Sequence, residues 1–181
     1  MTQLFDSDDL GKALQRVSVD VFDLLTGDQP DNIVFVGILT NGVFFAKRIQ
    51  YKLKQLSFDV SVPVMELDIS LYRDDFSSKK DYMSVVTNNN VNFNLDGKHV
   101  VLFDDVLSTA RTARAALNAI FDFGRPEKVS FVVLFDRKNR QVPIEPNVVG
   151  EILDVDQALR VNVGFFEVKG EDNVVTAPFS D

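Results

Sequence analysis

The sequence contains no cysteine and no tryptophan, and it has a single histidine among its 181 residues. The absence of cysteine excludes disulfide bonds, thiolate metal sites and a cysteine nucleophile, and it agrees with a reducing compartment. No apolar run approaches the ~20 residues that a membrane-spanning helix needs. The opening segment, MTQLFDSDDLGKAL, also lacks the basic and apolar parts of a secretory signal. We therefore expect a cytoplasmic protein with no membrane contact.

Positive charge is also scarce. The chain has 19 Lys and Arg against 27 Asp and Glu, a formal net charge of −8 at pH 7. Nucleic-acid binding depends on clustered cations that neutralise phosphates, so this balance argues against an RNA partner and leaves only a local basic patch open. Hydrophobic residues make up 45% of the chain, enough for a proper core. The length fits one domain, which we expect to span residues 1–181.

The spacing of apolar residues predicts alternating helices and strands. Amphipathic helices are expected at residues 6–27, 43–56 and 109–123. Strands are expected at residues 32–38, 60–71, 85–93, 100–103, 129–135, 148–152 and 161–168. His99 precedes the central strand without a matching ligand nearby in sequence, so we expect its side chain to be solvated. Alternating elements favour right-handed crossovers, and hence an α/β fold with a mainly parallel, twisted sheet flanked by helices.

The stretch LFDDVLSTARTARAAL puts two adjacent carboxylates, Asp104 and Asp105, directly after a buried strand. Ligands of open parallel sheets bind where strands end and helices begin. Paired acids suit ribose hydroxyls, or Mg²⁺ held through hydroxyls and water. The hydroxyl-rich turn at residues 108–112 offers backbone N–H groups and a helix start, which suit a phosphate. These residues indicate a sugar-phosphate site; the alternative is that the acids only cap the helix and the hydroxyls finish the turn.

The same stretch resembles the phosphoribosyl-pyrophosphate (PRPP) motif of type I phosphoribosyltransferases. Together with VGILTNGVFFAKRI, ELDISLYRDDFS and LFDRKNRQVPI, it resembles the PyrR family of pyrimidine-operon attenuators and uracil phosphoribosyltransferases. The resemblance implies the type I phosphoribosyltransferase fold with a small flap or hood, and a homodimer or higher homo-oligomer. It also implies transfer from PRPP to a nucleobase, with uracil favoured, giving UMP and pyrophosphate. Mg²⁺ is then expected to bind through PRPP and water.

The resemblance further assigns roles to individual residues. Asp104 and Asp105 would be catalytic and hold the ribose hydroxyls, residues 108–112 would bind the 5′-phosphate, and residues 39–42 would cradle the pyrophosphate. Residues 72–80 would form a lid that excludes water, and Asp136 and Arg137 would lie near the base. The substrate-binding residues assigned in this way are Thr40, Asn41, Gly42, Arg73, Ser108, Thr109, Ala110, Arg111, Thr112, Asp136, Arg137 and Val161.

Two departures from the family pattern bear on catalysis. Asn41 stands where the pyrophosphate turn usually has arginine, and losing a charge-assisted contact there would cost about 1.5–3 kcal/mol. Ala110 replaces the usual glycine of the phosphate turn. Its methyl group is harmless at negative φ but interferes at positive φ, or if phosphate must approach the backbone closely. A regulator that binds PRPP or a nucleotide without turnover is therefore the alternative to an enzyme.

Charge also disfavours the attenuator role. The RNA-binding members of the family use a basic face built from the first helix and the loop after the DR strand. Here Arg140 is kept, but Asn139, Glu145 and Glu151 stand where histidine, arginine and lysine are usual. Replacing cations by acids inverts the local field, and the loss of phosphate contacts removes much of the affinity. We therefore expect weak or no binding of attenuator RNA.

Overall fold

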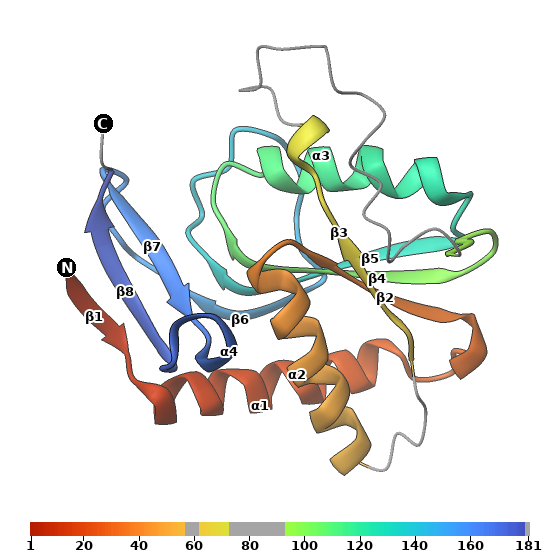
Figure 1. The fold of residues 1–181 in the computed structure, drawn as a ribbon, viewed down its shortest axis with the longest axis horizontal. Helices are drawn as coiled ribbons and strands as arrows, with labels where there is room; N and C mark the ends of the chain where they lie inside the picture. Colours follow the sequence, from red (N-terminus) through yellow and green to blue (C-terminus); the bar gives the residue numbers. More distant parts are fainter. Residues whose placement is uncertain (57–61, 73–92, 180–181) are drawn as a thin grey trace.

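The computed structural model describes residues 1–56, 62–72 and 93–179. Its centre is a parallel sheet of five strands in the order β3-β2-β4-β5-β6 (Figure 1). The strands are β2 (Ile33–Ile38), β3 (Val64–Leu67), β4 (His99–Leu107), β5 (Lys128–Asp136) and β6 (Val148–Ile152). β2, β4 and most of β5 are buried, as expected for strands covered on both faces. This sheet confirms the predicted α/β fold.

Helices cover both faces of the sheet. α1 (Ser7–Leu24) and α2 (Asn41–Gln55) lie on one face, and α3 (Arg111–Ile120) lies on the other (Figure 1). α1 begins where Asp6 caps it, since the Asp6 carboxylate accepts a hydrogen bond of 2.9 Å from the backbone N–H of Asp9. Short 3₁₀ turns occupy Pro30–Asn32, Ser70–Tyr72 and Phe121–Phe123. Among the described helices, none is long and apolar enough to cross a membrane.

The sheet separates two hydrophobic cores. The first, under α1 and α2, contains Phe35, Phe45 and Phe103, whose rings contact one another at centroid distances of 4.9 and 5.3 Å. The second, under α3, is built from smaller residues, including Ala113 and Ala116 of that helix. The apolar face of α3 packs against this side of the sheet. Both helices that follow β2 and β4 are thereby held firmly against the strands that precede them.

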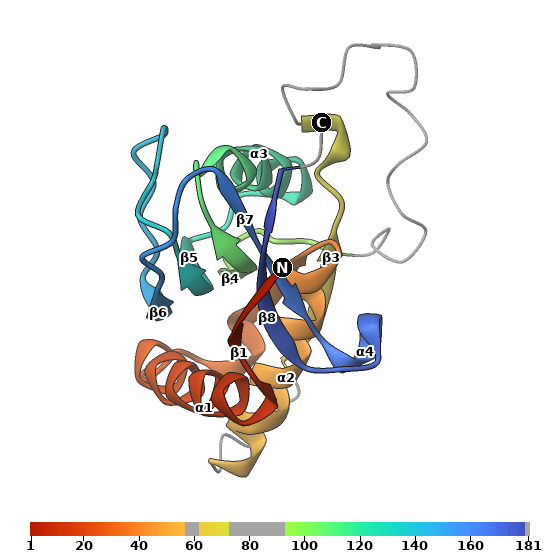
Figure 2. The ribbon, with the colours of Figure 1, turned by 90° about the vertical axis from the view of Figure 1, so that its left-hand side faces the viewer.

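A small antiparallel sheet, here called the hood, stands beside the main sheet in Figure 1 and faces the viewer in Figure 2. Its strands, in the order β1-β8-β7, are β1 (Thr2–Phe5), β8 (Asn173–Pro178) and β7 (Leu159–Gly164). A short helix, α4 (Phe166–Lys169), links β7 to β8. Sequence reasoning missed β1 and β8, and the strand predicted at 161–168 is wrong in its second half, where α4 lies.

Three further elements differ from their predicted bounds. The long strand predicted at 60–71 is short, because the Asp68 carboxylate accepts a 2.9 Å hydrogen bond from the Ser70 N–H and turns the chain. The strand predicted at 100–103 continues to Leu107, since β5 supplies pairing partners along that length. The helix predicted at 109–123 ends as α3 at Ile120 and continues as a 3₁₀ turn. The strand predicted at 85–93 lies outside the described residues, apart from Phe93.

The prediction of a solvated His99 is wrong. The side chain is buried at the start of β4. Its Nδ1 lies 2.5 Å from Asp28 Oδ2, and its Nε2 lies 2.9 Å from the Oγ of Ser130 on the neighbouring strand β5. Ser130 is fully buried, which leaves the hydroxyl no access to a substrate. Both partners are distant in sequence, so His99 joins three segments at the amino edge of the sheet.

Candidate functional site

Strand β4 extends beyond its neighbour β2. The last β2–β4 pair is Gly37 with Phe103, whereas β5 pairs with β4 as far as Leu107. Asp104 and Asp105 therefore lie on a segment of β4 that is supported by β5 but open on the β2 side. The helices that follow β2 and β4 cover opposite faces of the sheet (Figure 1). This position is a topological switch point, where ligands of open α/β sheets bind.

A cavity of about 550 Å³ lies at this point. It contains four of the predicted site residues, Thr40, Asn41, Asp104 and Asp105. The other residues that line it are Ile38, Leu39, Arg160 and Val168. The chain after β2, the end of β4 and the hood with α4 thus form its walls. Predicted site residues from two distant segments are brought together here.

Asn41 holds this constellation in place. As the first residue of α2, it donates its side-chain amide to Asp105 Oδ2 at 2.6 Å and to the backbone carbonyl of Val163 in β7 at 3.1 Å. The second oxygen of Asp105, Oδ1, accepts the N–H of Val106 at 2.9 Å. Asp104 Oδ1 accepts the N–H of Asp105 at 3.1 Å. A single amide therefore connects the helix, the acidic pair and the hood.

Ionising both Asp104 and Asp105 is electrostatically unfavourable. Burial, followed by the neighbouring charge of Asp105, raises the pKa of Asp104 well above its ordinary value. Burial likewise raises the pKa of Asp105, although the hydrogen bond from Asn41 opposes that rise. Because the two groups interact, the pair resists carrying two full negative charges. A ligand that brings hydroxyl donors or a cation would relieve this cost.

Close packing at two glycines shapes the chain between β2 and α2. A Cβ atom on Gly42 would lie 2.4 Å from the carbonyl oxygen of Phe103, and one on Gly37 would lie 2.4 Å from the Cα of Val43. The predicted site residue Gly42 is buried and lets α2 begin directly against β4, beside Asp104. The Leu39–Thr40 peptide bond in this segment is cis. Any larger residue at Gly42 would push the helix start away from the carboxylates.

The predicted phosphate turn lies just beyond the acidic pair. Ser108 Oγ donates to Asn139 Oδ1 at 3.1 Å, and the carbonyl of Thr109 accepts the N–H of Gln141 at 3.0 Å. Arg111 Nε donates to Gln141 Oε1 at 3.1 Å, and Thr112 follows, half-buried, in the first turn of α3. These contacts tie the turn to the loop after β5. The residues of the turn do not line the cavity described above.

Ala110 resolves a question left open by the sequence. It has φ +67° and ψ +9°, the left-handed conformation that favours glycine. No side chain caps α3 at this residue. Ala110 therefore has the unfavourable, positive φ, and it lies at the N-terminus of α3, where phosphate would bind.

Asp136 and Arg137 follow β5, the strand next to the acidic pair. Asp136 is fully buried and accepts hydrogen bonds from the guanidinium of Arg140 at 2.6 Å and from the N–H of Lys138 at 2.8 Å. Arg137 donates to the carbonyl of Asp156 at 3.0 Å, while its buried Nε has no partner within the described ranges. Asp136 thus stabilises the loop after β5, whereas Arg137 keeps an unused N–H donor on its buried Nε.

Two other predicted site residues are not brought to the cavity. Val161 is half-buried in β7 and packs against the core under α1 and α2. Arg73 and the predicted lid beyond Tyr72 lie outside the described residues. Conversely, sequence reasoning missed Arg160 and Val168 as cavity residues. Nothing in the local pattern around them points to β4, because only the folding of the hood brings them there.

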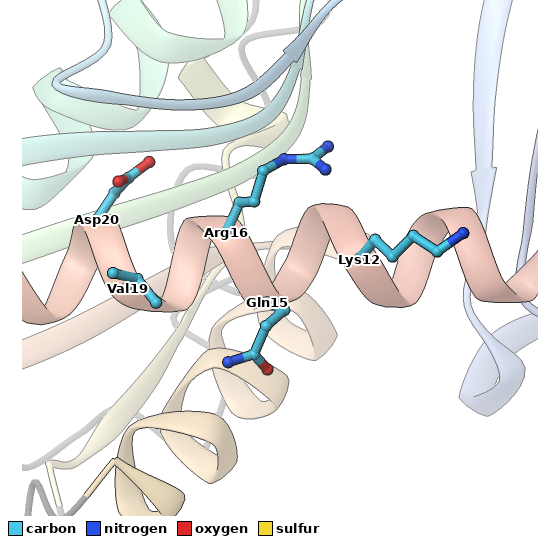
Figure 3. A pocket seen from close by; sticks show the side chains of 5 residues that line it. All are labelled: Lys12, Gln15, Arg16, Val19 and Asp20. Carbon is cyan, nitrogen blue, oxygen red and sulfur yellow. The ribbon is translucent and has the colours of Figure 1, made fainter.

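A second, open hollow of about 470 Å³ lies on the exposed side of α1. It is lined by Lys12, Gln15, Arg16, Val19 and Asp20 (Figure 3). Arg16 forms an ion pair with Glu151 at the end of β6, and Lys12 lies 3.4 Å from Asp9. The cations of this helix face are therefore already matched by carboxylates. This surface is where the resemblance placed RNA contacts.

Comparison with known proteins agrees with this geometry. Residues 1–160 match the phosphoribosyl transferase domain family. The chain is 39% identical over 173 residues to the Bifunctional protein PyrR of Limosilactobacillus fermentum, covering 95% of each chain. It is 42% identical over 173 residues to the protein of the same name from Ligilactobacillus salivarius, covering 95% of this chain and 96% of the other. In structure it resembles the hypoxanthine phosphoribosyltransferase of Trypanosoma cruzi, with a TM-score of 0.71 at 19% identity over 98% of this chain and 97% of the other.

Proposed function

The chain belongs to the type I phosphoribosyltransferase family, in its PyrR branch, and from this premise we propose that it converts uracil and PRPP to UMP and pyrophosphate. The observation that carries the proposal is the position of Asp104 and Asp105. They line a cavity at the switch point of the sheet, and the turn before α3 follows them directly. Carboxylates suited to ribose hydroxyls and a helix N-terminus suited to a phosphate are thus adjacent, as are the ribose and the 5′-phosphate of a phosphoribosyl group.

Binding divides among three parts of the site. Asp104 and Asp105 accept hydrogen bonds from the ribose hydroxyls. The turn that contains Ser108 and Thr109 receives the 5′-phosphate through backbone N–H groups and hydroxyls, aided by the positive end of the α3 dipole. Arg137, directly after β5, is the residue that would lie near the base, where an arginine donor suits a carbonyl oxygen of a pyrimidine or purine. The chain after β2 receives the pyrophosphate.

Catalysis on this arrangement depends on orientation and charge. Displacement of pyrophosphate from C1 by a base nitrogen passes through an oxocarbenium-like sugar, as glycosidic cleavage does. Such a step needs no protein nucleophile, which agrees with a chain that has no cysteine. The negative field of Asp104 and Asp105 stabilises positive charge that develops on the ribose. Fixing the ribose by its hydroxyls and its phosphate supplies the alignment.

The residues present are compatible with Mg²⁺ that arrives with PRPP. In the described ranges, no three Asp, Glu or His side chains are grouped to hold a metal. Asp105 has both oxygens engaged by Asn41 and Val106, so the acidic pair offers few free ligands and suits contact through hydroxyls and water. When bound, Mg²⁺ would neutralise phosphate charge and assist the departure of pyrophosphate. Asp104 and Asp105 would hold it indirectly.

A regulator that binds PRPP or a nucleotide without turnover is the second candidate. Two observations favour it. Asn41 directs its amide to Asp105 and Val163 instead of offering a cation to pyrophosphate. Ala110 holds the left-handed conformation with a methyl group at the phosphate turn. Both features reduce contacts to the phosphates of the substrate, and neither removes the site for ribose.

The deciding experiment is an assay of the purified protein with PRPP, Mg²⁺ and uracil, following UMP by chromatography. Hypoxanthine and guanine are tested in parallel, because the fold is shared with a hypoxanthine phosphoribosyltransferase. UMP formation is the expected result. If no base gives product but calorimetry detects PRPP binding, the protein is a regulator and not an enzyme. A variant with both Asp104→Asn and Asp105→Asn should lose PRPP binding; unchanged affinity would contradict the assignment of the acidic pair.

A further inference from the structure

The turn that would receive pyrophosphate carries no cation of its own. Family resemblance leads one to expect arginine at position 41, and the chain has Asn41 instead. The Asn41 amide has two N–H donors, and its nitrogen contacts the Asp105 carboxylate at 2.6 Å and the Val163 carbonyl at 3.1 Å. Its donors are thus committed to the protein. A pyrophosphate placed beside Asn41 would meet two carboxylates and no compensating positive charge from this turn.

Arg160 is the only cationic residue that lines the cavity in the described part of the chain. It lies in β7, three residues before Val163, whose carbonyl Asn41 holds against the site. Asp104 and Asp105 line the same cavity from the end of β4. The hood thus brings a guanidinium to the same cavity that holds the expected ribose site.

The guanidinium of Arg160 is also free to bind a ligand. The residue is exposed, and within the described ranges it forms no ion pair or side-chain hydrogen bond. The contrast with other arginines is clear: Arg48 binds Glu167 and Asp172, and Arg140 binds Asp136. An unpaired arginine beside a cavity suits an anionic ligand with several oxygens, because its planar fork binds such groups in a bidentate manner.

We propose that Arg160 binds the pyrophosphate group of PRPP and supplies from the hood the positive charge that Asn41 does not supply from the turn. The inference rests on the proposed function, because it assumes that PRPP occupies this cavity. In this arrangement the cation of the pyrophosphate site comes from β7 of the hood and not from the start of α2. Asn41 does not contact the phosphates, and its hydrogen bonds hold β7 against the acidic pair.

The test compares Arg160→Gln with the wild-type protein and with Arg125→Gln. Arg125 is exposed before β5, at the opposite edge of the sheet, so its variant has the same change of charge away from the cavity. Calorimetry in the presence of Mg²⁺ measures the affinity for PRPP, for inorganic pyrophosphate and for ribose 5-phosphate. We expect Arg160→Gln to weaken PRPP and pyrophosphate binding about tenfold and to leave ribose 5-phosphate binding within about twofold. Arg125→Gln should match the wild type for all three ligands.

The outcomes separate this inference from the proposed function. If the wild type binds PRPP and Arg160→Gln binds it equally well, the role of Arg160 is refuted while the site for PRPP stands. If Arg160→Gln weakens ribose 5-phosphate as much as pyrophosphate, Arg160 does not recognise the pyrophosphate group, and the inference is again refuted. If the wild type binds neither PRPP nor pyrophosphate, both the inference and the proposed function fail. Selective loss of pyrophosphate-containing ligands supports the assignment.

Discussion

Asn41 and Asp105 are 64 residues apart in sequence, yet the amide of Asn41 donates to the carboxylate of Asp105 at 2.6 Å. The same amide donates to the carbonyl of Val163 in the hood. This relationship changes the meaning of the departure from the family pattern. Asparagine at this position is a structural link between the acidic pair and the hood, and not simply an arginine contact that has been lost.

The link can be tested by Asn41→Ala. The substitution leaves the half-buried carboxylate of Asp105 and the carbonyl of Val163 without their amide donor, so we expect the free energy of unfolding to fall by about 2 kcal/mol. Urea unfolding measures the change. Asn162→Ala is the matched control, since Asn162 lies in the same strand as Val163 and forms no side-chain hydrogen bond within the described residues. Equal stability of the two variants would show that the link contributes nothing.

Ala110 and Ala116 provide a contrasting pair of alanine-to-glycine substitutions. Both are buried in the core under α3, but Ala110 has φ +67° and Ala116 is helical. Ala110→Gly relieves the strain of alanine in the left-handed conformation, about 1–2 kcal/mol. This gain offsets the loss of the buried methyl group and the greater entropy of the unfolded chain. We expect its free energy of unfolding to change by less than about 1 kcal/mol. Ala116→Gly has no such gain and should destabilise by about 2 kcal/mol. Similar losses in both variants would contradict the strain at Ala110.

Asp104 makes stability depend on pH in a defined direction. Burial raises its pKa in the folded protein, so the folded state binds the proton more tightly than the unfolded chain. Its favourable contribution is fully present below the unfolded pKa of about 3.9 and is lost as the pH rises through the raised folded pKa. Asp104→Asn should therefore exceed the wild type in free energy of unfolding at pH 7 by about 0.5–2 kcal/mol.

The advantage of Asp104→Asn should shrink as the pH falls through the raised folded pKa of Asp104, because the wild-type carboxyl then takes up its proton. Denaturant unfolding at several pH values measures this trend. Asp154→Asn is the control, because Asp154 is exposed and should change stability by less than about 0.5 kcal/mol at every pH. A variant that is less stable than the wild type at pH 7 would show that the carboxylate is stabilised, not penalised, by its site.

RNA binding should be limited by two acids that stand where the RNA-binding members of the family usually have cations. Glu151 neutralises Arg16, and Glu145 is exposed in the preceding loop. We expect Glu145→Arg with Glu151→Lys to raise the affinity for a pyrimidine-leader RNA about tenfold at about 50 mM salt, with a steeper salt dependence. Gel retardation measures both effects. Asp31→Lys with Glu127→Lys makes the same change of charge elsewhere. An equal gain in RNA affinity from this control would show that only the net charge matters. Wild-type binding that persists at about 200 mM salt would overturn the charge argument itself.

The parts of the fold that sequence predicted well are those set by local patterns. Helix α1 has a regular apolar stripe and a capping Asp6, and its predicted bounds differ by only a few residues from those observed. Asp104 and Asp105 were placed correctly at the carboxyl edge of the sheet, because a strand followed by a turn and a helix is visible in the sequence. The hydrogen bond between Asn41 and Asp105 was not predicted, since it depends on how far β4 extends beyond β2.

What sequence missed depends on contacts between distant segments. The hood strands β1 and β8 are short and pair across almost the whole chain, so neither has a local partner that would identify it. Arg160 precedes an ordinary alternating segment, and only the hood brings it to the cavity. The burial of His99 likewise depends on Asp28 and Ser130, which the local sequence around the histidine does not indicate.

The pairing of β1 with β8 has a consequence for the order in which the molecule is assembled. Thr2 and Thr176 are 174 residues apart, yet they are partners in the hood. Closing so long a loop becomes favourable only after the central sheet has collapsed, so we expect the hood to form late in folding. The wall that carries Arg160 is therefore added to a sheet that is already built. A molecule halted before that step would retain the acidic pair and most of its secondary structure, and would still lack a complete cavity.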